Sequence, residues 1–117
     1  MSELKVVGTA VPRAEGNDKV SGLTLYAADV NLPGTLWAKI LRSPHPHARI
    51  RRVDVSKALK VPGVRAIITG ADVKGNLIGK QIRDLPVLCW DKVRFVGDRV
   101  AAVAADTVDA AEEATHL

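Results

Sequence analysis

The stretch from residue 36 to residue 70 constrains the fold more than any other part of this 117-residue chain. It reads LWAKILRSPHPHARIRRVDVSKALKVPGVRAIITG and holds two of the three histidines. Residues 36–41 are apolar except for Lys39, which predicts a strand covered on both faces with the lysine at an edge. Pro44 and Pro46 lack amide donors, so regular strand pairing has to pause between them. The stretch therefore predicts two strands joined by a stiff corner.

The residues after this corner predict a second strand and a very short helix. The apolar phase changes between Ile50 and Val53, and a bulge near residues 51–52 would reconcile the two halves. Asp54 or Ser56 can accept hydrogen bonds from the first free amides of a helix, so one of them is expected to cap a turn over residues 57–60. Pro62-Gly63 then ends that turn.

Three more strands and a C-terminal helix are expected in the second half of the chain. The strand candidates are 64–69, 93–96 and 99–105, and Gly97-Asp98 is expected to join the last two as a hairpin. Residues 74–84 show no apolar period and are expected to form a loop. Asp106 or Thr107 can cap a helix whose apolar face carries Val108, Ala111, Ala114 and Thr115. No glycine or proline terminates this helix before Leu117, so the helix is expected to be truncated.

These elements predict an α+β domain over residues 19–117. It would contain a mixed sheet of several short strands, a short central helix after Asp54, and a C-terminal helix packed on the sheet. Residues 1–18 are turn-rich and are expected to form an irregular lead-in segment. Residues 23–27 are a further strand candidate, and Pro33-Gly34 suits a type II turn.

Composition narrows the possible functions. The net charge is +4 and the isoelectric point is near 9.5, which invites a nucleic-acid hypothesis. However, the basic residues are scattered, and Trp37, Trp90, Tyr26 and Phe95 are the four aromatic residues, too few for a base-stacking platform. The cluster Arg49, Arg51 and Arg52 is better interpreted as a solvated basic face or one that meets an acidic partner.

No run approaches the ~20 apolar residues of a membrane span, and no secretory signal is seen, so a cytoplasmic location is expected.

The side chains with chemical potential do not combine into a predicted site. His45 and His47 share one face if they lie on a strand, which would permit a metal clamp, but no third ligand lies near them in sequence. A rigid corner, with imidazoles that bond to backbone groups or face a neighbouring domain, is the favoured interpretation. Cys89 is the single cysteine, has no evident source of a lowered pKa, and is expected to be buried. Gly70, Gly75 and Gly79 are followed by no Lys-Ser/Thr pair and predict no phosphate loop. No catalytic, cofactor-binding or metal-binding residue is therefore assigned.

Four motifs in order along the chain resemble the N-terminal a/b hammerhead domain of the molybdenum hydroxylase large subunits, the xanthine dehydrogenase and aldehyde oxidase family. They are PGTL at 33–36, RSPHPHARI at 42–50, PGV at 62–64 and VGDRVAAVAA at 96–105. The matching segments are KVSGLTLYAADVNLPGTLWAKILRSPHPHARIRRVDVSKALKVPGVRAIITGADV and DLPVLCWDKVRFVGDRVAAVAADTVDAAEEA, which cover nearly all of residues 19–114.

The resemblance implies a holoenzyme that uses molybdopterin, often as its cytosine dinucleotide, to hydroxylate heteroaromatic rings or aldehydes. Carbon monoxide-oxidising and thioester-reducing relatives are also known. Electrons would leave through 2Fe-2S clusters to FAD on other domains or subunits. The family's pterin-contacting loops and catalytic glutamate lie beyond this domain, and no position of this sequence matches them. The chain alone is therefore expected to be inactive, and its implied partners are the remaining molybdenum-binding domains and the iron–sulfur and flavin components.

Three functional hypotheses follow. The favoured one is a structural and interface domain of a molybdenum hydroxylase. A free-standing binding or assembly module derived from that family is the alternative, and a basic nucleic-acid-binding domain is a weaker one. Apolar surface that the rest of a large subunit would cover should be exposed here, so the isolated domain is expected to self-associate.

Overall fold

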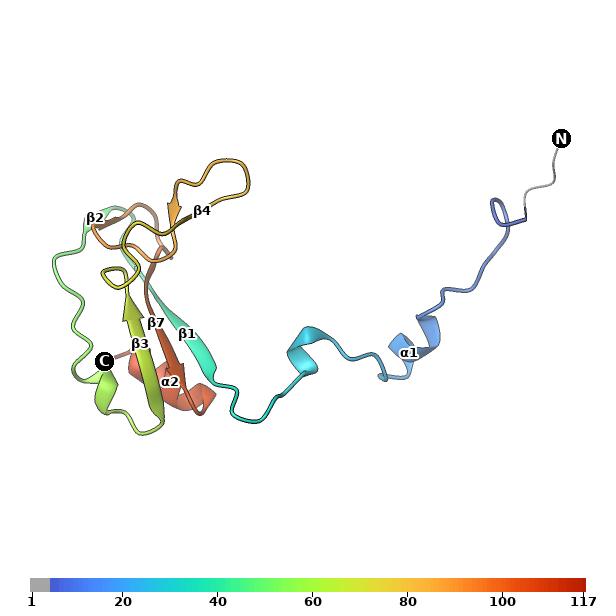
Figure 1. Cartoon of the computed structure of the whole chain (residues 1–117), viewed down its shortest axis with the longest axis horizontal. Helices are drawn as coiled ribbons and strands as arrows, with labels where there is room; N and C mark the ends of the chain where they lie inside the picture. Colours follow the sequence, from blue (N-terminus) through green and yellow to red (C-terminus); the bar gives the residue numbers. More distant parts are fainter. Residues whose placement is uncertain (1–4) are drawn as a thin grey trace. The chain divides into compact units, whose positions relative to one another are not determined.

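The computed structural model describes residues 5–117. The chain divides into two compact units, residues 1–33 and residues 34–117 (Figure 1). None of the helices in the described part is long and apolar enough to cross a membrane. The predicted start of the domain at residue 19 rests on motif resemblance rather than on compactness, and it stays a prediction.

The first unit contains two short helical segments. These are α1 (Gly16–Val20) and the 3-10 helix η1 (Ala27–Asp29). The expectation of an irregular segment is therefore wrong over α1. The strand predicted at 23–27 is also wrong, since these residues pair with no strand and the Tyr26 amide instead donates to Asp29 Oδ2 at 2.9 Å. A local turn closed by the Asp29 side chain forms here instead, because aspartate readily bonds to nearby backbone amides.

The second unit is built on a three-stranded antiparallel sheet. Its strands are β1 (Trp37–Arg42), β3 (Val64–Thr69) and β7 (Arg99–Ala105), in the order β1-β7-β3 (Figure 1). Valine and isoleucine in β3 fit a pleated sheet, and the small residues of β7 suit a central position and close packing. The strands predicted at 64–69 and 99–105 are confirmed. Gly34 has a φ of +78°, which is the value that the second central position of a type II turn requires.

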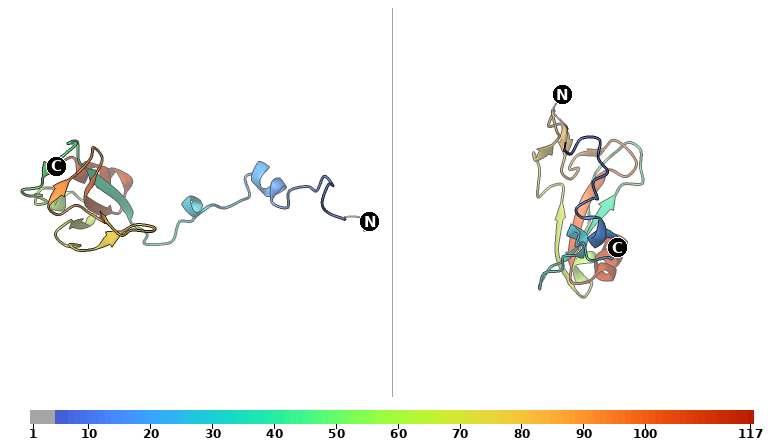
Figure 2. Two further views of the ribbon diagram at one scale, coloured as in Figure 1. Left: turned by 90° about the horizontal axis from the view of Figure 1, so that it is seen from above. Right: turned by 90° about the vertical axis from the view of Figure 1, so that its right-hand side faces the viewer.

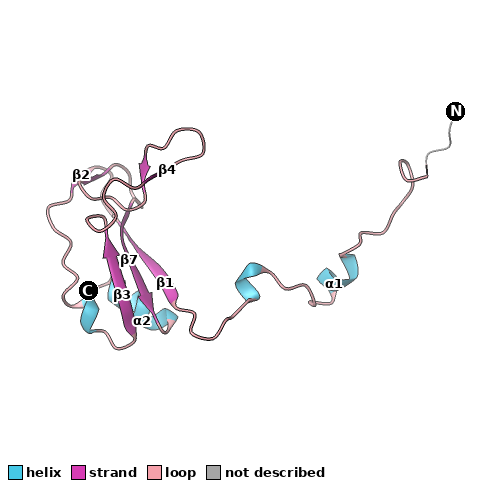
Figure 3. Ribbon diagram, in the orientation of Figure 1, coloured by secondary structure: helices cyan, strands magenta, loops and turns pink. Residues whose placement is uncertain are grey.

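Two-residue strands form two further antiparallel pairs. β2 (Ala48–Arg49) pairs with β6 (Lys92–Val93), and β4 (Leu77–Ile78) pairs with β5 (Leu85–Pro86). The hairpin predicted around Gly97-Asp98 is therefore wrong, because β6 and β7 pair with different strands, and the strand expected at 93–96 ends at Val93. The loop expected over residues 74–84 contains β4, although most of the segment between β3 and β7 is irregular, as Figure 3 shows.

The second unit contains two helical segments, at the two places where the sequence predicted them. The short helix predicted after Asp54 is present as the 3-10 helix η2 (Ala58–Lys60). The predicted cap is wrong: the N-cap is Lys57, without a side-chain cap hydrogen bond, because Asp54 Oδ1 accepts from the Ser56 amide at 3.0 Å, ahead of the helix. Gly63, with a φ of +90°, follows the end of η2. Helix α2 (Val108–Thr115) is capped by Thr107, whose hydroxyl accepts from the Ala110 amide at 3.2 Å. The other predicted cap, Asp106, instead forms an ion pair with Arg65 at 2.8 Å.

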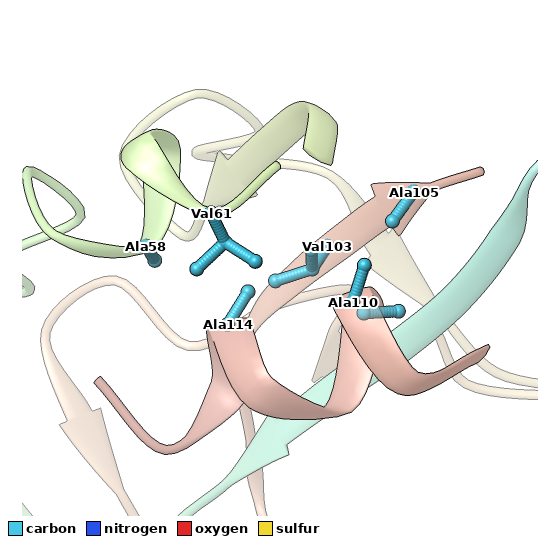
Figure 4. Packing of buried hydrophobic residues seen from close by; sticks show 7 residues of the cluster. Ala58, Val61, Val103, Ala105, Ala110 and Ala114 are labelled. Atoms are coloured by element: carbon cyan, nitrogen blue, oxygen red, sulfur yellow. The ribbon is translucent and has the colours of Figure 1, made fainter. Parts of the chain in front are cut away.

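Helix α2 lies along one face of the three-stranded sheet (Figures 1 and 2). Its buried alanines meet β7 and η2 in one apolar cluster (Figure 4). That cluster consists of Ala58, Val61, Val103, Ala105, Ala110, Ala111 and Ala114. Ala105 and Ala111 are fully buried, so small side chains fill the interface between the helix and the strand. The α+β class and the helix packed on the sheet are confirmed.

Two details of the segment from β1 to residue 52 differ from the sequence expectation. The bulge predicted near residues 51–52 is wrong: β2 ends at Arg49, and the register shifts instead between Leu41 and Arg42. β1 is also an edge strand covered on one face only, since Ile40 on its other face remains 41% exposed. Lys39 points to the covered side, where its ammonium pairs with Glu112 of α2 at 3.0 Å.

Candidate functional site

Hydrogen bonds fix the backbone between β1 and β2, where residues 43–47 form what we call the Pro-His corner. The buried Ser43 donates its amide to the Asp98 carbonyl at 2.9 Å, and its own carbonyl accepts from the Gly97 amide at 2.8 Å. Ser43 Oγ also accepts from the His45 amide at 3.0 Å. These bonds tie the corner to the turn before β7, which explains why strand pairing resumes only at Ala48.

The imidazoles of this corner are not part of a ligand cluster. His45 and His47 are exposed, and neither ring makes any of the hydrogen bonds found among the described residues. Residues 5–117 bring together no group of three or more histidine, cysteine or acidic side chains that could hold a metal ion. The corner thus presents two imidazoles to solvent on a rigid backbone.

Cys89 and Asp98 form a buried polar pair. Cys89 belongs to a second core cluster, which it forms with Val93 and Val100. Cys89 is 1% exposed and Asp98 is 4% exposed. Burial, followed by the hydrogen bond to the Asp98 carboxylate, raises the pKa of the Cys89 thiol to about 11. Burial opposes ionisation of Asp98 as well, but hydrogen bonds from the Arg94 amide, the Cys89 thiol and the Arg99 amide outweigh it and lower its pKa. The expected buried cysteine is confirmed, and its raised pKa leaves it protonated near neutral pH.

The sheet face opposite α2 is apolar and open. Side chains alternate along a strand, so residues out of phase with those that contact α2 point to this second face. These residues, which we call the open sheet face, are Ala38, Ile40, Ala66, Ile68, Ala102 and Ala104, and they lie opposite one another in register. Ile40 and Ile68 keep 41% and 43% of their surface exposed. An apolar sheet face of this kind is suited to packing against another layer of protein.

A second surface feature lies beside β2. A groove of about 440 Å³ runs between the Pro-His corner, β2 and residues 50–54. Its exposed rim carries the four arginines Arg42, Arg49, Arg51 and Arg52 together with Asp54, and residues 115–117 also line it. The less exposed floor carries Leu41, Ile50, Val53, Val93 and Val100. We call this feature the arginine groove. The structure thus places the predicted basic cluster along one edge of an apolar depression.

The open sheet face was not identified from the sequence, although a signal for it was present. The apolar run 36–41 predicted coverage on both faces of the strand, and the structure covers only one. The surplus of apolar residues on the second face is therefore the signal of an additional layer. The arginine groove had a weaker signal, because its floor residues come from separate segments of the chain.

Comparisons with known proteins agree with the motif resemblance. Residues 21–117 match the sequence model of "Aldehyde oxidase and xanthine dehydrogenase, a/b hammerhead domain". A probable xanthine dehydrogenase subunit of Bacillus subtilis (strain 168) is 50% identical over 106 residues, which cover 90% of this chain and 14% of that protein. The nicotinate dehydrogenase large molybdopterin subunit of Eubacterium barkeri is 41% identical over 113 residues, covering 96% of this chain and 27% of that protein.

A solved structure gives the same result for the fold. A Cu,Mo-CO dehydrogenase in its carbon monoxide reduced state superposes with a TM-score of 0.89 at 38% identity, covering 94% of this chain and 14% of that one. The chain therefore spans between 14% and 27% of the length of these relatives. The family resemblance stated from the motifs is confirmed. This chain belongs to the aldehyde oxidase and xanthine dehydrogenase family, in which it corresponds to the a/b hammerhead domain.

Proposed function

We propose that this chain is a structural and interface domain of a molybdenum hydroxylase large subunit and performs no catalytic step by itself. The observation that carries this proposal is the open sheet face. Its six apolar side chains come from all three strands of the main sheet, while α2 covers the other face. Protein domains are usually built of two or three layers around a core, and here a layer beyond the open face would complete the packing. The proposed occupant is the remaining, molybdenum-binding part of the same large subunit.

The side chains of the described residues do not provide the ligands of an iron–sulfur cluster. Iron–sulfur clusters need several thiolates, and the one cysteine of this chain is buried with its pKa raised to about 11. Two of the carboxylates are already engaged: Asp106 by Arg65 at 2.8 Å, and Glu112 by Lys39 at 3.0 Å. We propose that molybdopterin, the 2Fe-2S clusters and FAD are held by other domains or subunits of the holoenzyme.

The proposal is tested by analysing the purified chain for bound cofactors and activity. We expect no stoichiometric molybdenum or iron by elemental analysis, no flavin absorbance, and no oxidation of aldehydes or purines. An active molybdenum hydroxylase assayed in parallel is the control for both measurements. One molybdenum atom per chain, retained through gel filtration, would overturn the proposal.

A further inference from the structure

We infer that the arginine groove binds an acidic, extended segment of a separate polypeptide. This assignment adds a second partner surface to the proposed interface role, on a different set of side chains from the open sheet face. The two surfaces can therefore fail independently when they are tested.

The rim of the groove has unneutralised positive charge. Among the described residues, Arg49 and Arg51 form no ion pair with a carboxylate. Arg52 is paired with Asp54 at 2.7 Å, and Arg42 donates to the Gly97 carbonyl at 2.9 Å. Guanidinium groups bind carboxylates with fixed bidentate geometry, so Arg49 and Arg51 are free to receive acidic side chains.

The floor of the groove favours a polypeptide over a simple anion. Ile50 and Val53 are half-buried and pack against the core formed by Cys89, Val93 and Val100. Inorganic phosphate bound at the rim would leave this apolar floor exposed to water. An extended segment in which acidic and apolar residues alternate can place carboxylates on the rim and aliphatic side chains on the floor, because alternate side chains of an extended chain point to opposite sides.

One wall of the groove is conformationally restricted before any ligand binds. The Pro-His corner forms one wall, and its backbone is fixed by the Ser43 bonds at 2.8 and 2.9 Å. Pro44 and Pro46 further restrict that wall, so little conformational entropy is lost when a ligand docks.

Charge indicates which occupant is bound. Charged rims steer separately diffusing partners together, whereas permanent interfaces are more apolar, like the open sheet face. A second copy of this chain is disfavoured as the occupant of the groove because each copy carries a formal net charge of +4. The self-association expected from exposed apolar surface does not involve this charged rim. An acidic partner polypeptide fits both the sign of the rim and the apolar character of the floor.

Fluorescence anisotropy with the 117-residue chain tests the inference. The probe is a fluorescein-labelled peptide of about eight residues that alternates glutamate and leucine. We expect saturable binding that weakens as salt rises, and little binding of a peptide in which lysine replaces glutamate. We also expect weaker binding of a peptide in which serine replaces leucine, since the floor would then stay unfilled.

Substitutions locate the binding. The double variant Arg49→Ala/Arg51→Ala should weaken binding by about tenfold, and Arg51→Glu alone should weaken it further than Arg51→Ala. The matched control is Lys57→Ala/Lys60→Ala, which removes the same charge outside the groove and should change binding by less than about twofold. All of these positions are exposed, so the thermal midpoint should be the same for every variant.

Four results would overturn the inference. They are unchanged binding by the arginine variant, equal binding of the lysine peptide, complete displacement of the probe by millimolar phosphate, and a concentration-dependent dimer that the arginine variant abolishes. The third would identify a plain anion site, and the fourth would identify a second copy as the occupant. None of them would bear on cofactor content or on the open sheet face.

Discussion

Asp98 shows how one residue can hold several segments together. Its two carboxylate oxygens accept from the Arg94 amide at 3.0 Å and the Arg99 amide at 3.1 Å, and its carbonyl accepts from the Ser43 amide. The Cys89 thiol contacts the same carboxylate. This single buried acid therefore joins the Pro-His corner, the segment before β7 and the second core cluster.

We predict that Asp98→Asn lowers the free energy of unfolding by about 1–3 kcal/mol at pH 7, because one acceptor is replaced by a donor that faces an amide. The pKa of Asp98 is lower in the folded chain than its ordinary value of 3.8. Its contribution is therefore fully present above the unfolded pKa and is lost as pH falls through the folded pKa. Urea unfolding of both proteins at several pH values measures the difference.

The difference in the free energy of unfolding between the parent and Asp98→Asn should shrink once the pH falls below about 4, because the Asp98 carboxyl of the unfolded chain protonates there. Asp109→Asn is the matched control, since Asp109 is exposed and makes none of the described side-chain hydrogen bonds. A penalty for Asp98→Asn that stays constant down to a pH of about 2 would show that the carboxylate charge has no part in the stabilisation.

Among the elements, the turn after β3 packs directly on the segment that contains Cys89. A Cβ built at the buried Gly70 would overlap the Cys89 carbonyl and come within 2.7 Å of the Trp90 amide nitrogen. Gly70 is not in the left-handed region, so the lack of space, and not the backbone conformation, requires glycine there.

We predict that Gly70→Ala lowers the free energy of unfolding by about 1–3 kcal/mol, because the two segments must separate to admit the methyl group. Guanidinium unfolding followed by circular dichroism measures the loss. Gly75→Asn is the control in the neighbouring turn: its φ of +87° is tolerated by asparagine, and its Cβ would meet no atom within 4 Å. If Gly70→Ala proved no more destabilising than Gly75→Asn, the close approach described here would be wrong.

The sequence predicted elements with strong local signals and failed where partners were remote. Residues 64–69 are rich in β-branched residues and bounded by glycines, so β3 was predicted with its observed bounds. The Thr107 cap of α2 was predicted correctly because capping is a local interaction. The pairing of β7 was missed: Gly97-Asp98 indicated a hairpin, but the small side chains of β7 suit a central position between β1 and β3. The candidate surfaces could be predicted only in part, because each collects residues from segments far apart in the chain.

Taken as a whole, the second unit presents two surfaces of different character. The six residues of the open sheet face are all apolar, which suits permanent packing within one large subunit. The arginine groove combines a charged rim with an apolar floor, which suits a separate partner. On the two proposals made above, one surface would meet the catalytic remainder of the large subunit and the other a second polypeptide.

The open sheet face is proposed to dock this chain onto the catalytic remainder of a large subunit. The test mixes the 117-residue chain with the Bacillus subtilis relative, from which the segment that matches this chain has been deleted. Light scattering then measures the mass of any complex that forms. We predict a one-to-one complex that Ile40→Asp/Ile68→Asp abolishes, because two carboxylates would be buried without partners. Leu59→Asp/Ile82→Asp, which places the same charges at residues 54% and 73% exposed outside that face, should leave the complex intact. A complex that forms equally well with Ile40→Asp/Ile68→Asp would show that the open sheet face is not the docking surface.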